Sequence, residues 1–188
     1  MAATVRKNIW LYRTSDGVAP EIRSNQTLVA TPGILIPNTP LFLGSTTGHW
    51  ETADTCDGTG DIFHGLFVGL QDSTATWPLA ADPAATQEIR VLIIDPDDTY
   101  AIFCENSGTD AAATQAIIGN DYGMTVSTTT GAVGYTTLDL NATTYTCARV
   151  VQVMGNIEPS KFDLTTTTNG VALVRFMAAH VNEEKANT

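Results

Sequence analysis

The stretch EIRVLIIDPDDTYAIFCE, residues 88–105, indicates the fold class of this chain. Two runs of β-branched and aromatic residues flank Asp-Pro-Asp-Asp. Such runs pack well on a pleated sheet, whereas Asp and Pro favour turns. Apolar side chains alternate onto both faces of each run, with Val91 on one face and Leu92 on the other. The pattern predicts a β-hairpin that is covered on both sides, in the middle of a barrel or a sandwich.

The rest of the chain consists of short β-type segments separated by polar loops. The clearest further strands are predicted at residues 61–70, 122–127, 145–154 and 171–181, with shorter ones at 9–13, 31–43, 49–51 and 138–140. Residues 109–119, TDAAATQAIIG, are the best helix candidate, because Thr109 or Asp110 can cap a helix and Gly119 can end it. We expect a mainly β protein, a small β-barrel or β-sandwich-like domain with one short helix.

The first 26 residues differ from the remainder because they lack sustained periodicity. We expect an extended N-terminal arm at residues 1–26, a β-barrel domain at 27–182 and a frayed tail at 183–188. Aromatic and basic side chains often anchor interfaces. The candidate partner contacts in the arm are Arg6, Lys7, Ile9, Trp10, Tyr12 and Arg13. The alternative is that Trp10 simply packs on its own domain.

The charge of the chain excludes two classes of partner. The formal net charge is −11, and only nine Lys and Arg are present. Binding nucleic acid phosphates or an anionic membrane requires basic side chains. The first residues lack the apolar region of a signal peptide, and no run of about 18 apolar residues could form a transmembrane helix. We expect a protein made in the cytoplasm that binds neither nucleic acid nor membrane.

The sequence contains no nucleophile elbow, P-loop, metalloprotease or dinucleotide-binding motif, so we expect no enzyme activity and no cofactor. Two groups of acidic residues could suggest a cation site. Asp95, Asp97 and Asp98 are better interpreted as a turn, because the following residues form a strand at once. The second group, Asp54, Asp57 and Asp61, lies in one loop and leaves weak Ca²⁺ binding as an alternative.

Histidine and cysteine complete the search for chemistry. His64 lies on the apolar face of its predicted strand, which favours a core histidine over a metal ligand. The three cysteines, Cys56, Cys104 and Cys147, cannot all pair with one another, and we expect reduced thiols. With no CxxC and scattered histidines, the sequence predicts no metal site.

From Gly33 onward, the order of several features resembles the decoration or cement proteins of tailed-phage heads. The stretches that carry the resemblance are the Pro/Gly-rich residues 32–43, the apolar strand 61–70, RVLIIDPDDTYAIFCE at 90–105, TQAIIGND at 114–121, GAVGYTTLDL at 131–140 with the strand 145–154, and the closing strand 171–181. In the family's G-x-N-x-D segment a residue separates Gly from Asn, whereas Asn120 directly follows Gly119 here. The N-terminal arm lies outside the resemblance.

The resemblance implies a virion structural protein that binds the outer surface of a phage capsid and cements the shell. It implies a β-barrel-like domain, no catalysis and no cofactor. The expected partners are the major capsid protein and further copies of the chain, with a trimer favoured over a dimer. The expected location is the exterior of the capsid, after synthesis in the host cytoplasm. The alternative is a tail or fibre head that recognises a surface glycan, with Trp50 and Trp77 as candidate stacking platforms.

Overall fold

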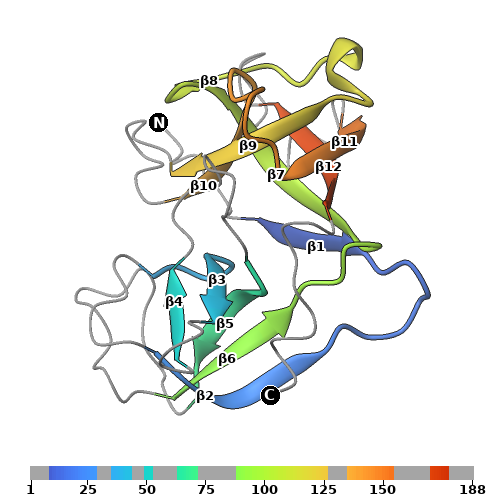
Figure 1. Ribbon diagram of the computed structural model, residues 1–188. Coiled ribbons are helices and arrows are strands. Elements are labelled where there is room, and N and C mark those ends of the chain that lie inside the picture. Colours follow the sequence, from blue (N-terminus) through green and yellow to red (C-terminus); the bar gives the residue numbers. More distant parts are fainter. Residues whose placement is uncertain are drawn as a thin grey trace, which may run out of the picture.

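The structure, a computed structural model, describes residues 9–28, 35–43, 49–52, 63–71, 88–126, 135–154 and 170–177. Within these residues the chain forms twelve β-strands and one 3₁₀ turn (Figure 1). The prediction of a mainly β protein is confirmed. The strands form two sheets, one above the other in the view of Figure 1.

The seven-stranded sheet is the upper one in Figure 1. Its strands are β1 (Trp10–Arg13), β7 (Thr99–Asn106), β8 (Thr109–Asp110), β9 (Asp121–Val126), β10 (Thr136–Asp139), β11 (Ala148–Met154) and β12 (Val171–Phe176). Their order is β1-β7-β10-β9-β11-β12, and β8 is added to β7. Because β12 also pairs with β7, five of the strands form a closed circuit of hydrogen-bonded neighbours. All pairings are antiparallel except that of β10 with β7.

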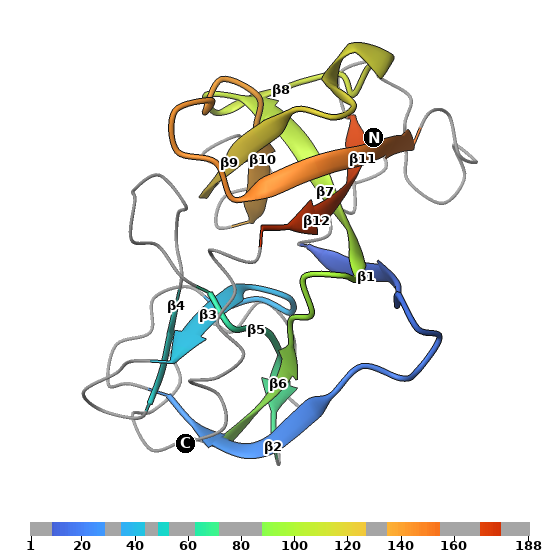
Figure 2. The same ribbon diagram turned by 45° about the vertical axis from the view of Figure 1, so that its right-hand side comes forward.

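The five-stranded sheet is the lower one in both views (Figure 2). Its strands are β2 (Ile22–Thr27), β3 (Pro40–Leu43), β4 (Trp50–Thr52), β5 (Gly65–Leu70) and β6 (Glu88–Ile93). They follow the order β2-β6-β5-β3-β4, with every pairing antiparallel. An isolated parallel bridge between Leu28, just after β2, and Trp50 in β4 connects the two ends of this order.

Both strands predicted in residues 88–105 are confirmed, but the predicted hairpin is wrong. β6 belongs to one sheet and β7 to the other, so the Asp-Pro-Asp-Asp turn connects the two sheets instead of closing a hairpin. The reason lies in the faces of the strands. β7 is apolar and buried on both faces, whereas β6 exposes Glu88 and Arg90 on one of its faces. Only β7 therefore needs cover on both sides.

The predicted helix at residues 109–119 is also wrong. The segment begins with the two-residue strand β8 and contains a single 3₁₀ turn, η1 (Gln115–Ile117). The backbone of Ala111 is held in extended form, because its N–H donates to the Cys104 carbonyl at 3.0 Å and its carbonyl accepts from the Gly170 N–H at 2.7 Å. These contacts to neighbouring strands outweigh the helix propensity of the alanines, which is only a weak preference.

The two sheets pack together through a shared apolar core. The larger core cluster lies in the seven-stranded sheet, yet Phe63, Leu66 and Ile94 from the neighbourhood of β5 and β6 belong to it. The Phe63 ring meets the Phe176 ring edge to face, with 4.7 Å between the ring centroids. A second cluster around Trp50 lies within the five-stranded sheet. Because this cluster contains residues from both sheets, the two sheets pack against each other and share a core.

The segment predicted as an N-terminal arm contributes a strand to each sheet. β1 pairs with β7, and β2 pairs with β6. Ile9 is completely buried in the shared core, and Trp10 packs on Phe103. Residues 9–27 are therefore part of the folded molecule. Their apolar side chains pack against residues that are distant in sequence, and such contacts leave no periodic pattern in the segment itself. Residues 1–8 and the predicted tail at 183–188 lie outside the described residues.

Candidate functional site

The structure separates the six predicted partner contacts into three groups. Ile9 is buried, and Trp10 is half-buried with its ring centroid 6.0 Å from that of Phe103. Tyr12 and Arg13 are exposed at the end of β1. The last two, Arg6 and Lys7, lie outside the described residues. The alternative in which Trp10 packs on its own domain is therefore what the structure shows.

Exposed apolar side chains gather in the segment that runs from β1 to β2. Tyr12 is 49% exposed, Val18 63% and Ile22 50%. Large apolar side chains are costly to leave in water, and a local group of them often marks a contact surface. We use the name N-terminal face for the three exposed apolar side chains of this one segment, Tyr12, Val18 and Ile22. The sequence indicated Tyr12 only, because Val18 and Ile22 stand in a stretch without periodicity.

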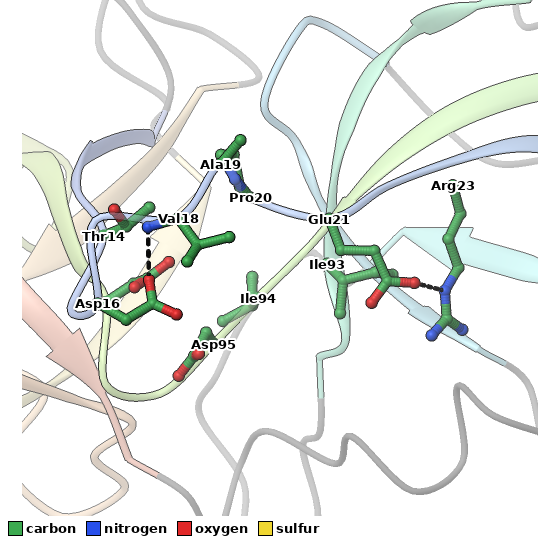
Figure 3. Close-up of a pocket in the computed structure, with 11 residues that line it drawn as sticks. Thr14, Asp16, Val18, Ala19, Pro20, Glu21, Arg23, Ile93, Ile94 and Asp95 are labelled. Atoms are coloured by element: carbon green, nitrogen blue, oxygen red, sulfur yellow. Dashed lines mark hydrogen bonds and ion pairs between the residues drawn. The ribbon is translucent and has the colours of Figure 1, made fainter.

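A cavity of about 250 Å³ lies beside this face, between the β1–β2 connection and the β6–β7 connection (Figure 3). Its apolar wall includes Val18, Pro20 and Ile94. Four carboxylates line it as well, from Asp16, Glu21, Asp95 and Asp98. Among the described lining residues the basic one is Arg23, whose Nε lies 2.6 Å from a Glu21 carboxylate oxygen.

Asp98, in the β6–β7 connection, is hydrogen-bonded to the β1–β2 connection on the other side of the cavity. Its carboxylate accepts a hydrogen bond from the Ser15 N–H at 2.8 Å, and the residue is 4% exposed. Burial raises the pKa of the Asp98 carboxyl, and the nearby carboxylates of Asp95 and Asp16 raise this pKa further. The cavity is thus a region of negative potential beside an exposed apolar face.

The Asp-Pro-Asp-Asp segment is a turn, as predicted. The Asp97 N–H donates to the Asp95 carboxylate at 2.8 Å, and the Asp98 N–H donates to the Asp95 carbonyl at 3.1 Å. Within the described part of the chain, no three His, Cys, Asp or Glu side chains are arranged to hold a metal ion. The loop carboxylates considered for Ca²⁺, Asp54, Asp57 and Asp61, fall outside the described residues.

Among the described residues, one histidine and both cysteines are buried, whereas His49 is exposed. His64 is 3% exposed, and its Nδ1 accepts a hydrogen bond from the Leu43 N–H at 2.9 Å. Cys104 and Cys147 are free thiols in the core, and burial raises the pKa of Cys104 to about 12. A thiol with such a pKa stays protonated at neutral pH and is a poor nucleophile. Cys56 lies outside the described residues.

Trp50 is not a glycan platform. It is 1% exposed, and its indole N–H donates to the Gln26 side-chain carbonyl at 2.9 Å. Its ring also meets the imidazole of His64 edge to face. Trp50 is therefore a central part of the second core cluster. The other aromatic proposed for that role, Trp77, lies outside the described residues.

Among the described residues, no helix has the length and apolar character needed to cross a bilayer. On the described surface, the candidate site is the group of exposed apolar side chains called the N-terminal face, together with the acidic cavity beside it. Compared with known proteins, the chain matches no family model, no curated protein and no solved structure.

Proposed function

We propose that this protein is a virion structural protein that binds the outer surface of a phage capsid and stabilises the shell. The observation that carries the proposal is the N-terminal face, three exposed apolar side chains beside an acidic cavity on an all-β scaffold. The order of sequence features that resembles phage decoration proteins points to the same role. In this proposal the protein has no catalytic activity and no cofactor.

The physical requirements of a cementing protein are modest and fit this surface. Burying apolar area stabilises a contact by roughly 25 cal/mol per Å². Tyr12 and Ile22 are held in strands, so their backbone loses little conformational freedom on binding, and more of the burial free energy remains as affinity. Carboxylates at the rim favour partners that present Lys or Arg and reject acidic ones. Repetition around a symmetry axis adds avidity without new contacts.

The finer parts of the proposal concern assembly. We propose that each five-stranded circuit is a small β-barrel and that copies of the chain associate, with a trimer favoured over a dimer. The major capsid protein is the partner, and the protein lies on the capsid exterior after synthesis in the host cytoplasm. Arg6 and Lys7 precede β1 in sequence, so they are retained as candidate contacts together with Tyr12 and Arg13.

The test uses capsids that have been stripped of the protein. Removing residues 1–26 would destroy β1 and β2, so point substitutions are the sharper tool. Tyr12→Ser with Val18→Ser should lower the affinity for capsids at least about tenfold, as expected for central interface contacts worth more than about 1 kcal/mol. Tyr145→Ser is the matched control, because Tyr145 is 44% exposed but lies outside the N-terminal face. Equal occupancy of all three proteins on the capsid would overturn the proposal.

A further inference from the structure

The two sheets contain the same five-stranded circuit. In each circuit, the first strand along the chain pairs antiparallel with the fifth and parallel with the third. The second strand pairs antiparallel with both the third and the fourth, and the fourth with the fifth. The corresponding strands are β2 and β7, β3 and β9, β4 and β10, β5 and β11, and β6 and β12. β1 and β8 are additions to the second circuit.

The register of the fourth and fifth strands is the same in both circuits. Each pair begins at corresponding residues, and the β11–β12 pair continues one residue further, to Met154 with Val171. Corresponding residues of the two copies are separated by the same number of positions in both strands. The corresponding pairs are Gly65 with Ile93 and Ala148 with Phe176, then Leu70 with Ile89 and Val153 with Ala172. Each pair also contains one irregularity, between Phe67 and Gly69 in β5 and between Val150 and Gln152 in β11. These two irregularities occupy the same position.

The pairings of the second strand with the third and the fourth, and the parallel closure, agree as well. The corresponding pairs are Leu41 with Gly65 and Tyr122 with Ala148, Leu43 with Trp50 and Met124 with Leu138, and Leu28 with Trp50 and Cys104 with Leu138. The last of these is the parallel contact that closes each circuit.

The first and fifth strands agree where Thr27 pairs with Glu88 and Phe103 with Val171, but β2 then shifts by one residue between Gln26 and Arg23, whereas β7 continues without a shift. A shift of one residue along a whole strand would break the agreement, because it would turn that strand's side chains to the other face. The shift in β2 is local and leaves Gln26, Thr27 and Leu28 in the corresponding register.

The turn that leads into the second strand is also shared, although sheet pairing does not dictate it. Asn38 and Gly119 correspond, and both have a left-handed backbone, with φ of 68° and 86°. The Asn38 N–H donates to the Phe67 carbonyl at 2.6 Å, and the Gly119 N–H donates to the Val150 carbonyl at 2.8 Å. Few residues other than Gly and Asn adopt this backbone readily.

Two more pairs of hydrogen bonds correspond at the start of the fourth strand. The His64 N–H donates to the Leu41 carbonyl at 2.8 Å, and the Cys147 N–H donates to the Tyr122 carbonyl at 3.0 Å. The carbonyls of His64 and Cys147 then accept from corresponding residues after the fifth strand, Ile94 and Met177. The agreement thus extends beyond strand order to individual backbone groups in the connections.

We infer that the chain is a tandem duplication, in which residues 22–94 and 99–177 are two copies of one five-stranded unit. Unrelated five-stranded circuits could share an order of strands. A shared register at the pairings of the second, third and fourth strands and of the fourth with the fifth, a shared irregularity and a shared left-handed turn together indicate one common structural plan. This inference is independent of the proposed role on a capsid.

The copies differ on the outer face of the fifth strand. Glu88 and Arg90 of β6 are exposed, whereas the corresponding Val171 and Leu173 of β12 are buried in a cluster against which Trp10 packs. The second copy has thus acquired an apolar outer face together with the extra strand β1. The N-terminal face runs from this added strand to the first strand of the other copy, so a partner that covers it contacts both copies.

The direct experiment is a backbone NMR map of interstrand nuclear Overhauser contacts in the full chain. The duplication predicts parallel contacts at Leu28 with Trp50 and at Cys104 with Leu138, and antiparallel contacts in the corresponding registers of the second, third, fourth and fifth strands. A one-residue difference in register between corresponding pairs of these strands, or a missing parallel closure in either copy, would overturn the inference.

Exchange of corresponding turn residues is the second test. Gly119→Asn with Asn120→Thr transfers the Asn38-Thr39 pair into the second copy and should leave the thermal midpoint close to that of the parent. Gly119→Thr alone, with Asn120 kept, places a β-branched residue at the left-handed position and should lower the midpoint clearly. Asn38→Thr should lower it to a similar degree. Equal midpoints for Gly119→Thr and the in-register exchange would contradict the inference.

Discussion

Asp98 links the two described connections between the sheets, because its carboxylate accepts a hydrogen bond from the Ser15 N–H. Burial raises the pKa of Asp98 in the folded state, so folding favours its protonated form. Its contribution to stability is complete below the unfolded pKa near 3.8 and is lost as the pH rises through the raised folded pKa. Asp121 behaves in the opposite way, because the hydrogen bond from Arg149 lowers its pKa.

These opposite shifts give a prediction with its own control. The measurement is the free energy of unfolding in urea from pH 3 to 7. The value for the wild type minus the value for Asp98→Asn should fall as the pH rises. The free energy of unfolding of the wild type minus that of Asp121→Asn should instead rise with pH over the acidic part of the range. This rise should be small, because exposed ion pairs contribute about 0–1 kcal/mol. If both differences have the same slope, the environment assigned to Asp98 is wrong.

A second residue-scale prediction concerns the left-handed turn positions. Asn38→Gly should leave the free energy of unfolding unchanged or raise it slightly, because glycine adopts φ near 68° without a steric cost. Asn38→Val should lower it by about 1–3 kcal/mol, since a β-branched residue is strained in this backbone region. Thermal unfolding of the two variants checks this, and a stable Asn38→Val protein would argue against the turn.

At the scale of elements, β6 and β7 are both required, but for different sheets. Val91 is completely buried in the core of the five-stranded sheet, whereas Ile93 is half-buried at its edge. Val91→Asp should prevent folding, because an unpaired charge in a core costs several kcal/mol or more. Ile93→Asp should be milder, and Arg90→Asp, at an exposed site of the same strand, should be tolerated. Soluble, cooperatively unfolding Val91→Asp protein would show that β6 is not a core strand.

Local sequence predicted several individual strands but not how the strands pair. β5, β6, β7, β11 and β12 were predicted because β-branched and aromatic residues alternate in them. The hairpin and the helix were predicted wrongly, since turn chemistry at Asp95 and alanine content at 111–113 are local signals. Pairing of β6 with β2, and of β7 with β12, joins residues far apart in sequence, and no local pattern encodes such partners.

The candidate site was predicted less well than the strands, for the same reason. Tyr12 and Arg13 are exposed as expected, but Ile9 and Trp10 are drawn into the fold by partners elsewhere in the chain. The cavity exists only because the loop before β2 lies against the connection after β6. The duplication left little trace in the sequence, where Asn38-Thr39 corresponds to Gly119-Asn120.

At the scale of the whole molecule, the proposed function makes a prediction about particles. Capsids assembled without the protein should form normally but rupture at a lower temperature or a milder osmotic shock than complete ones. The reason is that a bound surface protein stabilises the assembled state by mass action, without taking part in its formation. Release of packaged DNA during heating measures this, with re-addition of the protein as the control. Equal rupture temperatures would indicate a role in display and not in cementing.

The most direct test of the central claim is a density map of the native particle obtained by electron cryomicroscopy. The account predicts density for the two sheets on the outside of the shell, with Tyr12, Val18 and Ile22 directed toward the capsid subunits. Density on the tail or a fibre only, or on the shell with the N-terminal face directed to solvent, would contradict it.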